Sequence, residues 1–334
     1  MENQHQAKLS SSELSQLWVG YTQDTLTVCT MKYFLQIVED PDIRPIIEQA
    51  LALSETHVQK LTALFQLDKR PVPIGFTEQD VNVMAPRLYS DPFLLDNVKQ
   101  TTQLGMQMYS QAIALCARHD VRQYFSDCLQ ESLQLYNWTI DTLLSKGLFV
   151  RSPYIDTPNQ VDFVTKQHFM SGWVGKQRPL LSLEIANLYA NLQRNALGTR
   201  LLTGFSQVVR SKKIQEYMIR GKEISSKHLQ VFSKILQEND LPASIPWDEG
   251  VTDSTVPPFS DKLMLFQVTS MNALGVAYYG TAVSTTFRRD LLVDYTRLIA
   301  EIGKYAEDGA NLLIENGWME EPPRMIDHDG LAKR

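Results

Sequence analysis

Apolar side chains recur every three or four residues over long stretches of this chain, the spacing that gathers them on one face of a helix. Residues 14–28 follow this spacing. Three serines, Ser10 to Ser12, and then Glu13 precede them, and these residues can cap the start of a helix. Residues 43–64 carry a second apolar stripe, which includes His57. The first half of the chain is therefore predicted to form four helices, over residues 10–39, 43–64, 91–117 and 121–146.

The segment between the second and third predicted helices, residues 69–87, contains three prolines and a glycine. Because these residues break helices, the segment is predicted to be a long non-helical connection. The joint between the third and fourth helices is short, from Arg118 to Asp120, which makes those two helices an antiparallel hairpin. A long crossover between the second and third helices (B to C) is a trait of ferritin-like four-helix bundles.

This four-helix pattern occurs twice. A shift of 171 residues aligns the two halves as far as the crossover, and a shift of 170 continues the alignment to the end of each fourth helix. A repeat of this kind fixes the architecture, and it predicts helices in the second copy near residues 179–209, 211–239, 259–288 and 290–317. The aligned pairs include Leu17 with Leu188, His57 with His228, Pro71 with Pro242, Tyr109 with Tyr279, Arg118 with Arg288, Glu131 with Glu301 and Gly147 with Gly317.

We therefore predict an all-α fold of two tandem ferritin-like four-helix bundles, with a long B-to-C crossover in each. The first bundle is predicted to span residues 9–155 and the second residues 179–325, joined by a connector of residues 156–178. The stretch from Val161 to Trp173 within the connector is rich in apolar and aromatic residues. Because free linkers are poor in such residues, we expect a short docking helix there.

The composition excludes several classes of protein. Of 334 residues, 43% are hydrophobic and 21% charged, and the net charge is −6 without a basic patch, so nucleic-acid binding is not expected. No stretch approaches the roughly 18 uninterrupted apolar residues of a membrane span, and residues 1–14 lack the pattern of a secretory signal. The cysteines, Cys29, Cys116 and Cys128, show no paired spacing and are expected to be reduced thiols.

The fourth helix and the second helix of each copy carry part of a known metal-binding pattern. Ferritin-like bundles that activate oxygen have a Glu-x-x-His pair on each of two helices and a glutamate on each of the other two. Here the second helix keeps the histidine, His57 or His228, but has a serine three residues earlier. The fourth helix keeps the acid, Glu131 or Glu301, but has no histidine three residues later. One histidine and one acid are too few for a dinuclear centre, so we favour a site that has decayed in both copies.

The simplest role for each histidine is a hydrogen bond inside its bundle, because an unsatisfied buried imidazole costs on the order of 1–3 kcal/mol. We expect His57 to pair with Glu131, and His228 with Glu301, in contacts that favour the protonated histidine. The alternative is a reduced metal site made of these same residues in one or both bundles, holding iron, zinc or manganese. Asp24 on the first helix could add a ligand, whereas its counterpart in the second copy is an asparagine.

Three further patterns have more than one interpretation. Asn187, Asn191 and Asn195 form a ladder at four-residue spacing, which suits either a hydrogen-bond network between helices or a ligand-binding row. The alternating charges of residues 294–308 suggest a solvated ion-pair face, which competes with placing Glu301 in the core. Aromatic and methionine side chains near the glycines of the third helices fill the core or line an apolar pocket. These side chains are Met106, Met108, Tyr109, Tyr278 and Tyr279.

The most distinctive sequence motifs lie in the second copy. They are RGKEI at residues 220–224 with His228, VTDST and PPFSDKLM within residues 251–264, RRDL at residues 288–291 and NGWMEEPP at residues 316–323. In these motifs, and over nearly its whole length, the chain resembles an uncharacterised family of Bacilli, the domain of unknown function 3231. That family is a tandem of ferritin-like bundles and is similar to the spore coat protein F group. The resemblance implies this fold twice over and a spore-forming or related Gram-positive host, and it implies no catalytic residues.

The usual enzyme signatures, such as a P-loop, a nucleophile elbow or a His-Glu-x-x-His motif, are absent from the sequence. We predict a non-enzymatic structural or interaction protein without a cofactor, related to sporulation or stress and located in the cytoplasm or the spore. Protein partners or self-association would fit that role. Two alternatives remain open: a metal-binding or oxidase protein with a reduced His/Glu site, and a binder of an apolar small molecule between helices.

Overall fold

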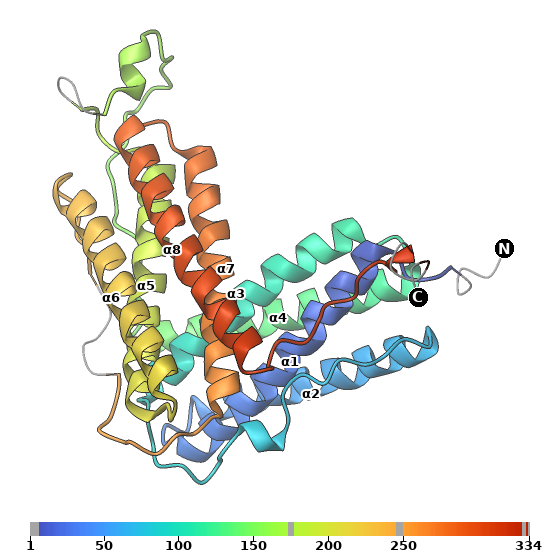
Figure 1. Ribbon diagram of the computed structural model, residues 1–334. Coiled ribbons are helices and arrows are strands. Elements are labelled where there is room, and N and C mark those ends of the chain that lie inside the picture. Colours follow the sequence, from blue (N-terminus) through green and yellow to red (C-terminus); the bar gives the residue numbers. More distant parts are fainter. Residues whose placement is uncertain (1–6, 173–176, 245–249, 329–331, 333–334) are drawn as a thin grey trace. The chain divides into compact units, whose positions relative to one another are not determined.

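The computed structural model describes residues 7–172, 177–244, 250–328 and 332, and these residues form eight α-helices without a β-strand (Figure 1). The helices fall into two sets of four, as the repeat predicts. The predicted all-α fold of two tandem four-helix bundles is confirmed. In the described part of the chain, no helix is both long and apolar enough to cross a membrane.

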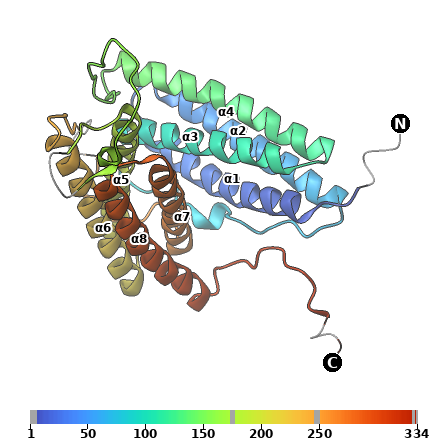
Figure 2. The same cartoon turned by 90° about the horizontal axis from the view of Figure 1, so that it is seen from above.

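The first four helices lie alongside one another (Figure 2). They are α1 (Ser11–Ile37), α2 (Arg44–Leu67), α3 (Asp91–Leu115) and α4 (His119–Ser145). The second four are α5 (Ser182–Val208), α6 (Lys212–Gln237), α7 (Asp261–Thr285) and α8 (Arg289–Glu315). Each helix lies within a few residues of its predicted range, because the apolar spacing and the capping residues specify the same limits. In the described residues, both crossovers are non-helical except for η2 (Glu78–Asp80), a single turn of 3-10 helix.

Helix α1 begins where the sequence predicts it, at a capping box. The Ser10 hydroxyl accepts a hydrogen bond from the backbone N–H of Glu13, and the Glu13 carboxylate accepts one from the N–H of Ser10. The other oxygen of Glu13 accepts from the N–H groups of Ala117 and Arg118, at 3.0 and 2.7 Å. One buried carboxylate therefore caps α1 and also fixes the joint between α3 and α4.

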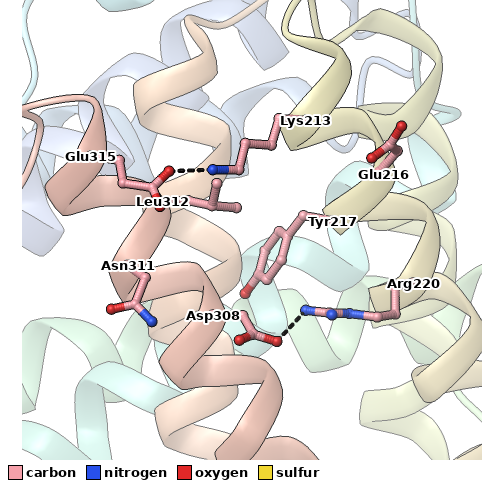
Figure 3. A pocket seen from close by; sticks show the side chains of 8 residues that line it. All are labelled: Lys213, Glu216, Tyr217, Arg220, Asp308, Asn311, Leu312 and Glu315. Atoms are coloured by element: carbon pink, nitrogen blue, oxygen red, sulfur yellow. Dashed lines mark hydrogen bonds and ion pairs between the residues drawn. The ribbon is translucent and has the colours of Figure 1, made fainter.

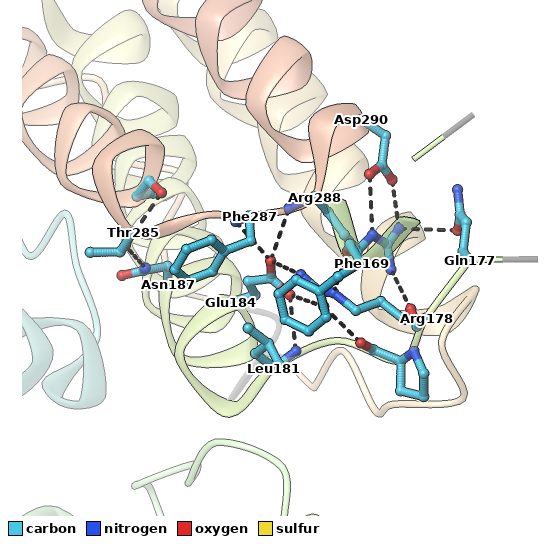
Figure 4. A network of polar contacts seen from close by, with 12 residues as sticks. Phe169, Gln177, Arg178, Leu181, Glu184, Asn187, Thr285, Phe287, Arg288 and Asp290 are labelled. Atoms are coloured by element: carbon cyan, nitrogen blue, oxygen red, sulfur yellow. Dashed lines mark hydrogen bonds and ion pairs between the residues drawn. The ribbon is translucent and has the colours of Figure 1, made fainter. Parts of the chain in front are cut away.

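The second copy reproduces this network (Figure 4). Glu184 at the start of α5 accepts hydrogen bonds from the N–H groups of Phe287 and Arg288, both at 3.2 Å. Arg288, 2% exposed, also donates to the carboxylate of Asp290. Arg178 adds a two-point ion pair to Glu184, with N–O distances of 2.7 and 2.8 Å. In both copies a glutamate at the start of the first helix binds the joint between the third and fourth helices. These acids and arginines therefore stabilise the fold.

The chain divides into two compact units, and each takes a short segment from the other half of the sequence. Unit 1 comprises Met1–Ala85, Leu94–Leu143 and Trp318–Arg334, and unit 2 comprises Pro86–Phe93 and Leu144–Gly317.

The segment Pro86–Phe93 is held in unit 2 by Tyr89. Its phenol donates a hydrogen bond to the carbonyl oxygen of Leu201 in α5 at 2.9 Å, and its ring stacks on Phe93 with centroids 4.0 Å apart. Gly204 of α5 makes room for this ring, because a Cβ atom there would lie 2.5 Å from the Tyr89 hydroxyl.

The segment that follows α8 is anchored in unit 1 by Glu320. Its carboxylate accepts hydrogen bonds from the N–H groups of Ile74 and Gly75, at 2.9 and 2.6 Å. Gly75 has a φ of +63°, a conformation that glycine adopts without strain, and this conformation points the two N–H groups at the carboxylate.

The connector contains η3 (Gln167–Met170), a 3-10 helix of four residues. Phe169 packs near Phe287 of unit 2, with ring centroids 6.1 Å apart, whereas Val161 and Phe163 are 94% and 84% exposed. The docking element is thus shorter than the expected stretch from Val161 to Trp173, and Trp173 lies outside the described residues.

Candidate functional site

The first bundle places His57 of α2 at its centre, between α1 and α4. The imidazole is 2% exposed. Its Nε2 atom lies 2.9 Å from the Glu131 carboxylate on α4, and its Nδ1 atom lies 3.3 Å from Asp24 on α1. The predicted pairing of His57 with Glu131 is confirmed, and Asp24 lies where the sequence allowed a further polar group.

Cys128, which the sequence predicts only to be a reduced thiol, is part of the same cluster. It lies one turn before Glu131 on α4 and is fully buried. One potential ligand atom each from His57, Cys128 and Glu131 lies within 4.8 Å of the other two. In the described residues this is the only group of three or more His, Cys, Asp and Glu side chains that converge closely enough to hold a metal ion. The signal in the sequence was a Cys-x-x-Glu pair on one helix face, which a search for Glu-x-x-His passes over.

The charge state of this cluster follows from its burial and its acids. Burial alone would lower the pKa of His57, but the hydrogen bond and the attraction of the Asp24 carboxylate outweigh it and raise the pKa to about 11. Burial raises the pKa of the Cys128 thiol, although His57 and Tyr124 act in the opposite direction. Burial also raises the pKa of the Asp24 carboxyl, against the stabilising contact with His57. At neutral pH, His57 is therefore an imidazolium beside a neutral thiol.

Two tyrosines complete the surroundings of His57. The rings of Tyr109 and Tyr124 meet the imidazole edge to face, with centroids 6.0 and 6.1 Å away. Burial raises the pKa of both phenols far above its ordinary value, so both are neutral. The Tyr124 hydroxyl interacts with the Cys128 thiol, whereas the Oδ2 atom of Asp24 is buried without a hydrogen-bond partner. A buried polar atom without a hydrogen-bond partner is rare in a protein core, so it marks a place that a hydrogen-bond donor could occupy.

A dinuclear centre does not fit these residues. Ser54 occupies the position of the glutamate in the first Glu-x-x-His pair, and Gln134 that of the histidine in the second. The carboxylates that would bridge two ions are missing. A single ion is compatible with the donor set, because imidazole, thiolate and carboxylate are the ligands that zinc takes in proteins.

The second bundle keeps the histidine but surrounds it differently. The Nε2 atom of His228 lies 3.1 Å from Glu301, which confirms the second predicted pair. Its Nδ1 atom faces the hydroxyl of Tyr279 at 3.1 Å, and the amide of Asn195 donates to that hydroxyl at 2.8 Å. Lys227 also binds both carboxylate oxygens of Glu301, at 2.8 and 3.0 Å.

The expectation that both histidines are protonated is wrong for the second copy. Burial lowers the pKa of His228, with repulsion from Lys227 and Arg297, and the contact with Glu301 does not compensate. The physical reason is the exchange of partner at Nδ1: a buried carboxylate faces His57, whereas a neutral phenol faces His228. In addition, Leu298 takes the place of Cys128, so the second bundle lacks the thiol.

A cavity of about 80 Å³ lies beside His57 in the first bundle. Its lining combines polar groups, among them Asp24 and Tyr109, with small and apolar residues such as Gly20, Gly105 and Met108. Met108 and Tyr109 of α3 thus line a pocket, whereas Tyr279 of α7 is buried in the core of the second bundle. Both interpretations of the aromatic and methionine side chains on these helices therefore apply.

The asparagine ladder of α5 makes hydrogen bonds between helices. Asn187 donates to the hydroxyl of Thr285 at 2.9 Å, and Asn195 reaches Tyr279, both on α7. Asn191 is 2% exposed, and its side-chain oxygen accepts from Arg194 at 3.3 Å.

A surface groove between α6 and α8 is lined by charged side chains (Figure 3). Arg220 on α6 pairs with Asp308 on α8 at 2.7 Å, and Lys213 pairs with Glu315. Of the predicted charge ladder over residues 294–308, Asp308 lies in this groove, and Asp294 and Arg297 form a second exposed ion pair at 3.2 Å. Glu301, in contrast, reaches inward to His228.

Comparison with family models finds the repeat again. The family model described as "Protein of unknown function (DUF3231)" matches residues 1–161 and, a second time, residues 168–331. No curated protein matches the chain. Among solved structures, a crystal structure at 1.54 Å resolution described as a "putative spore coat protein" from Bacillus halodurans is similar, with a TM-score of 0.42 and 16% sequence identity. The similarity covers 46% of this chain and 100% of that one.

Proposed function

The chain belongs to the DUF3231 family of proteins of unknown function, and we propose that it is a metal-binding protein whose first bundle holds one transition-metal ion. The observation that carries this proposal is the convergence of His57, Cys128 and Glu131 within 4.8 Å at the centre of that bundle. Tetrahedral zinc lies about 2.0–2.3 Å from such ligands, which puts the ligand atoms under about 4 Å apart. The three groups would have to move slightly closer together to reach that spacing.

Asp24 supports this assignment from outside the ligand set. Histidines that bind metals usually donate their other ring N–H to a carboxylate, which fixes the orientation of the ring. Asp24 occupies that position at Nδ1 of His57, and Nε2 then faces Glu131. The thiolate favours zinc or iron over magnesium and calcium, which prefer oxygen ligands.

The second bundle has the role of a scaffold in this proposal. Leu298 offers no ligand, and the ammonium group of Lys227 already binds the carboxylate of Glu301. A metal ion beside His228 would have to displace this ammonium group and would lack the thiol. We thus prefer the metal-binding alternative for the first bundle, and decay of the ancestral site for the second.

The test is metal analysis of the full chain. We expect the protein to bind about one equivalent of zinc, iron or manganese, and Co²⁺ in its place to give the charge-transfer band of a cobalt–thiolate bond. Cys128→Leu, which installs the residue of the second copy, should abolish the band and the stoichiometric binding. His228→Gln is the matched control and should leave both unchanged. Absence of a tight site in the wild type would return the protein to a purely structural role, and loss of the metal in His228→Gln alone would move the site to the second bundle.

A further inference from the structure

The cavity of the first bundle contains a buried acceptor without a donor. Asp24 is 6% exposed, its Oδ1 atom contacts His57, and its Oδ2 atom has no hydrogen-bond partner. Asp24 lines the cavity, whereas Cys128 and Glu131 do not. The free oxygen therefore faces a space beside the cluster, which His57 also lines but Cys128 and Glu131 do not.

The charges around this space are unbalanced. Two carboxylates, those of Asp24 and Glu131, share the single imidazolium of His57. Lys60 lies 3.8 Å from Glu131, is 41% exposed and does not line the cavity. Lysine and arginine are absent from the described lining of the cavity, so Asp24 meets no second cation there. A carboxylate oxygen in this situation is best satisfied by a charged N–H donor, whose hydrogen bond is about twice as strong as a neutral one.

The remainder of the lining suits a short aliphatic group. Met31, Leu53, Leu104 and Met108 supply apolar surface, and the volume of about 80 Å³ limits the occupant to a few non-hydrogen atoms.

Comparison with the second copy indicates that this space is a property of the first bundle. Ser132 and Leu135 line the cavity, whereas the residues at these positions in the second copy are Ile302 and Tyr305, both buried. The ring of Tyr305 stacks on Tyr217 with centroids 4.2 Å apart and fills the centre of that bundle. The larger side chains thus close the equivalent space.

We propose that the cavity of the first bundle binds a small protonated aliphatic amine, whose ammonium group donates to Oδ2 of Asp24 and whose alkyl group lies against Met31, Leu53 and Met108. None of the groups that would contact the amine is a proposed metal ligand, but Asp24 also holds His57, so the test uses the metal-free chain.

Ethylammonium chloride is the probe, titrated into the metal-free full chain with calorimetry and thermal melting as readouts. Ethanol serves as the neutral probe of equal size, and sodium chloride as the ionic-strength control. We expect saturable binding of ethylammonium with a rise in Tm, and at least about tenfold weaker binding of ethanol. Equal binding of the two, or none of either, would overturn the proposal and leave a cavity that holds water.

Two variants locate the binding. Asp24→Asn keeps the volume and removes the charge, and it should weaken ethylammonium binding by about tenfold or more. Ser132→Ile with Leu135→Tyr fills the space with the residues of the second copy and should abolish binding while the helical circular dichroism is retained. If the double variant does not fold, Asp24→Asn alone decides, and undiminished binding in that variant would contradict the proposal.

Discussion

Nε2 of His57 lies 2.9 Å from the carboxylate of Glu131, and a proton occupies the space between them at neutral pH because the pKa of His57 is raised to about 11. The same nitrogen is the one that would bind a metal ion, together with the thiol of Cys128. Protons and metal therefore compete for one set of atoms, and the outcome depends on pH.

Zinc affinity should rise steeply with pH. Both His57 and Cys128 are protonated at neutral pH, since the pKa of each is raised, and a metal ion must displace both protons. Release of two protons makes the apparent affinity rise up to about 100-fold per pH unit below these pKa values. Competition with a chelator of known affinity at several pH values between 6.5 and 8.5 measures the slope. In Cys128→Ser the slope should fall to about tenfold per unit, and a wild-type affinity independent of pH would contradict this account.

Asp24→Asn should weaken the zinc affinity, once corrected for proton competition at His57 and Cys128, about 10- to 100-fold without removing a ligand. A group that accepts a hydrogen bond from the other ring N–H of a metal-bound histidine typically contributes this much to metal affinity, because it orients the ring and increases its basicity. The Co²⁺ spectrum separates this role from a ligand role: the cobalt–thiolate band should keep its shape while the affinity falls. Asn195→Asp in the second bundle is the mirror-image control and should leave the affinity of the first bundle unchanged.

The two histidines should differ in protonation at pH 7. The carboxylate of Asp24 keeps His57 as an imidazolium up to about pH 11, whereas burial lowers the pKa of His228 and keeps it neutral. Nitrogen-15 NMR of the imidazole rings distinguishes the two states, with His57→Gln and His228→Gln assigning the signals. Replacing Asp24 by asparagine should move His57 toward the neutral form at pH 7. If both rings titrate together near pH 6.5, the different environments of the two copies have no effect on charge.

The sequence was sufficient for the fold because each helix is specified by several agreeing signals. The capping box of Ser10 and Glu13, the apolar stripes and the proline-rich crossovers all have local physical causes. The repeat places a histidine on the second helix and an acid on the fourth helix of each copy. Because these two helices pack in the same bundle, it predicted the pairs His57–Glu131 and His228–Glu301.

The remaining parts of the site could not be predicted, because they depend on which side chains meet across the bundle. Cys128 is aligned with Leu298, and only the packed structure shows that this position faces the histidine. Tyr279 is aligned with Tyr109, yet only Tyr279 contacts the histidine through its hydroxyl at 3.1 Å. Local sequence patterns also say nothing of the long-range contact by which Glu320 caps the turn at Gly75.

Gly221→Ala should destabilise the second bundle by about 1–3 kcal/mol, the range expected of overpacking. A Cβ atom at this position would lie 2.1 Å from the hydroxyl of Tyr305. The ring cannot move aside easily, because it stacks on Tyr217 and its hydroxyl donates to the Tyr217 carbonyl at 3.0 Å. Gly303 on α8 has open space around it, so Gly303→Ala should instead stabilise by up to about 1 kcal/mol through helix propensity. Urea denaturation of both variants measures the difference, and equal effects would contradict the packing argument.

A second metal site should appear when the second bundle receives the residues of the first. Leu298→Cys supplies the missing thiol one turn before Glu301, and Lys227→Thr removes the ammonium group that binds this carboxylate. Each change alone should give little binding. Leu298→Cys alone leaves the Glu301 carboxylate bound to Lys227, and Lys227→Thr alone leaves only His228 and Glu301 as ligands. The double variant should bind about two equivalents of Co²⁺ and double the cobalt–thiolate absorption. Leu298→Ser with Lys227→Thr is the control, since it makes a comparable core change without the thiolate and should keep one equivalent. One equivalent in the Cys–Thr variant, with the bundle still folded by circular dichroism, would show that His, Cys and Glu at this spacing do not suffice for a metal site.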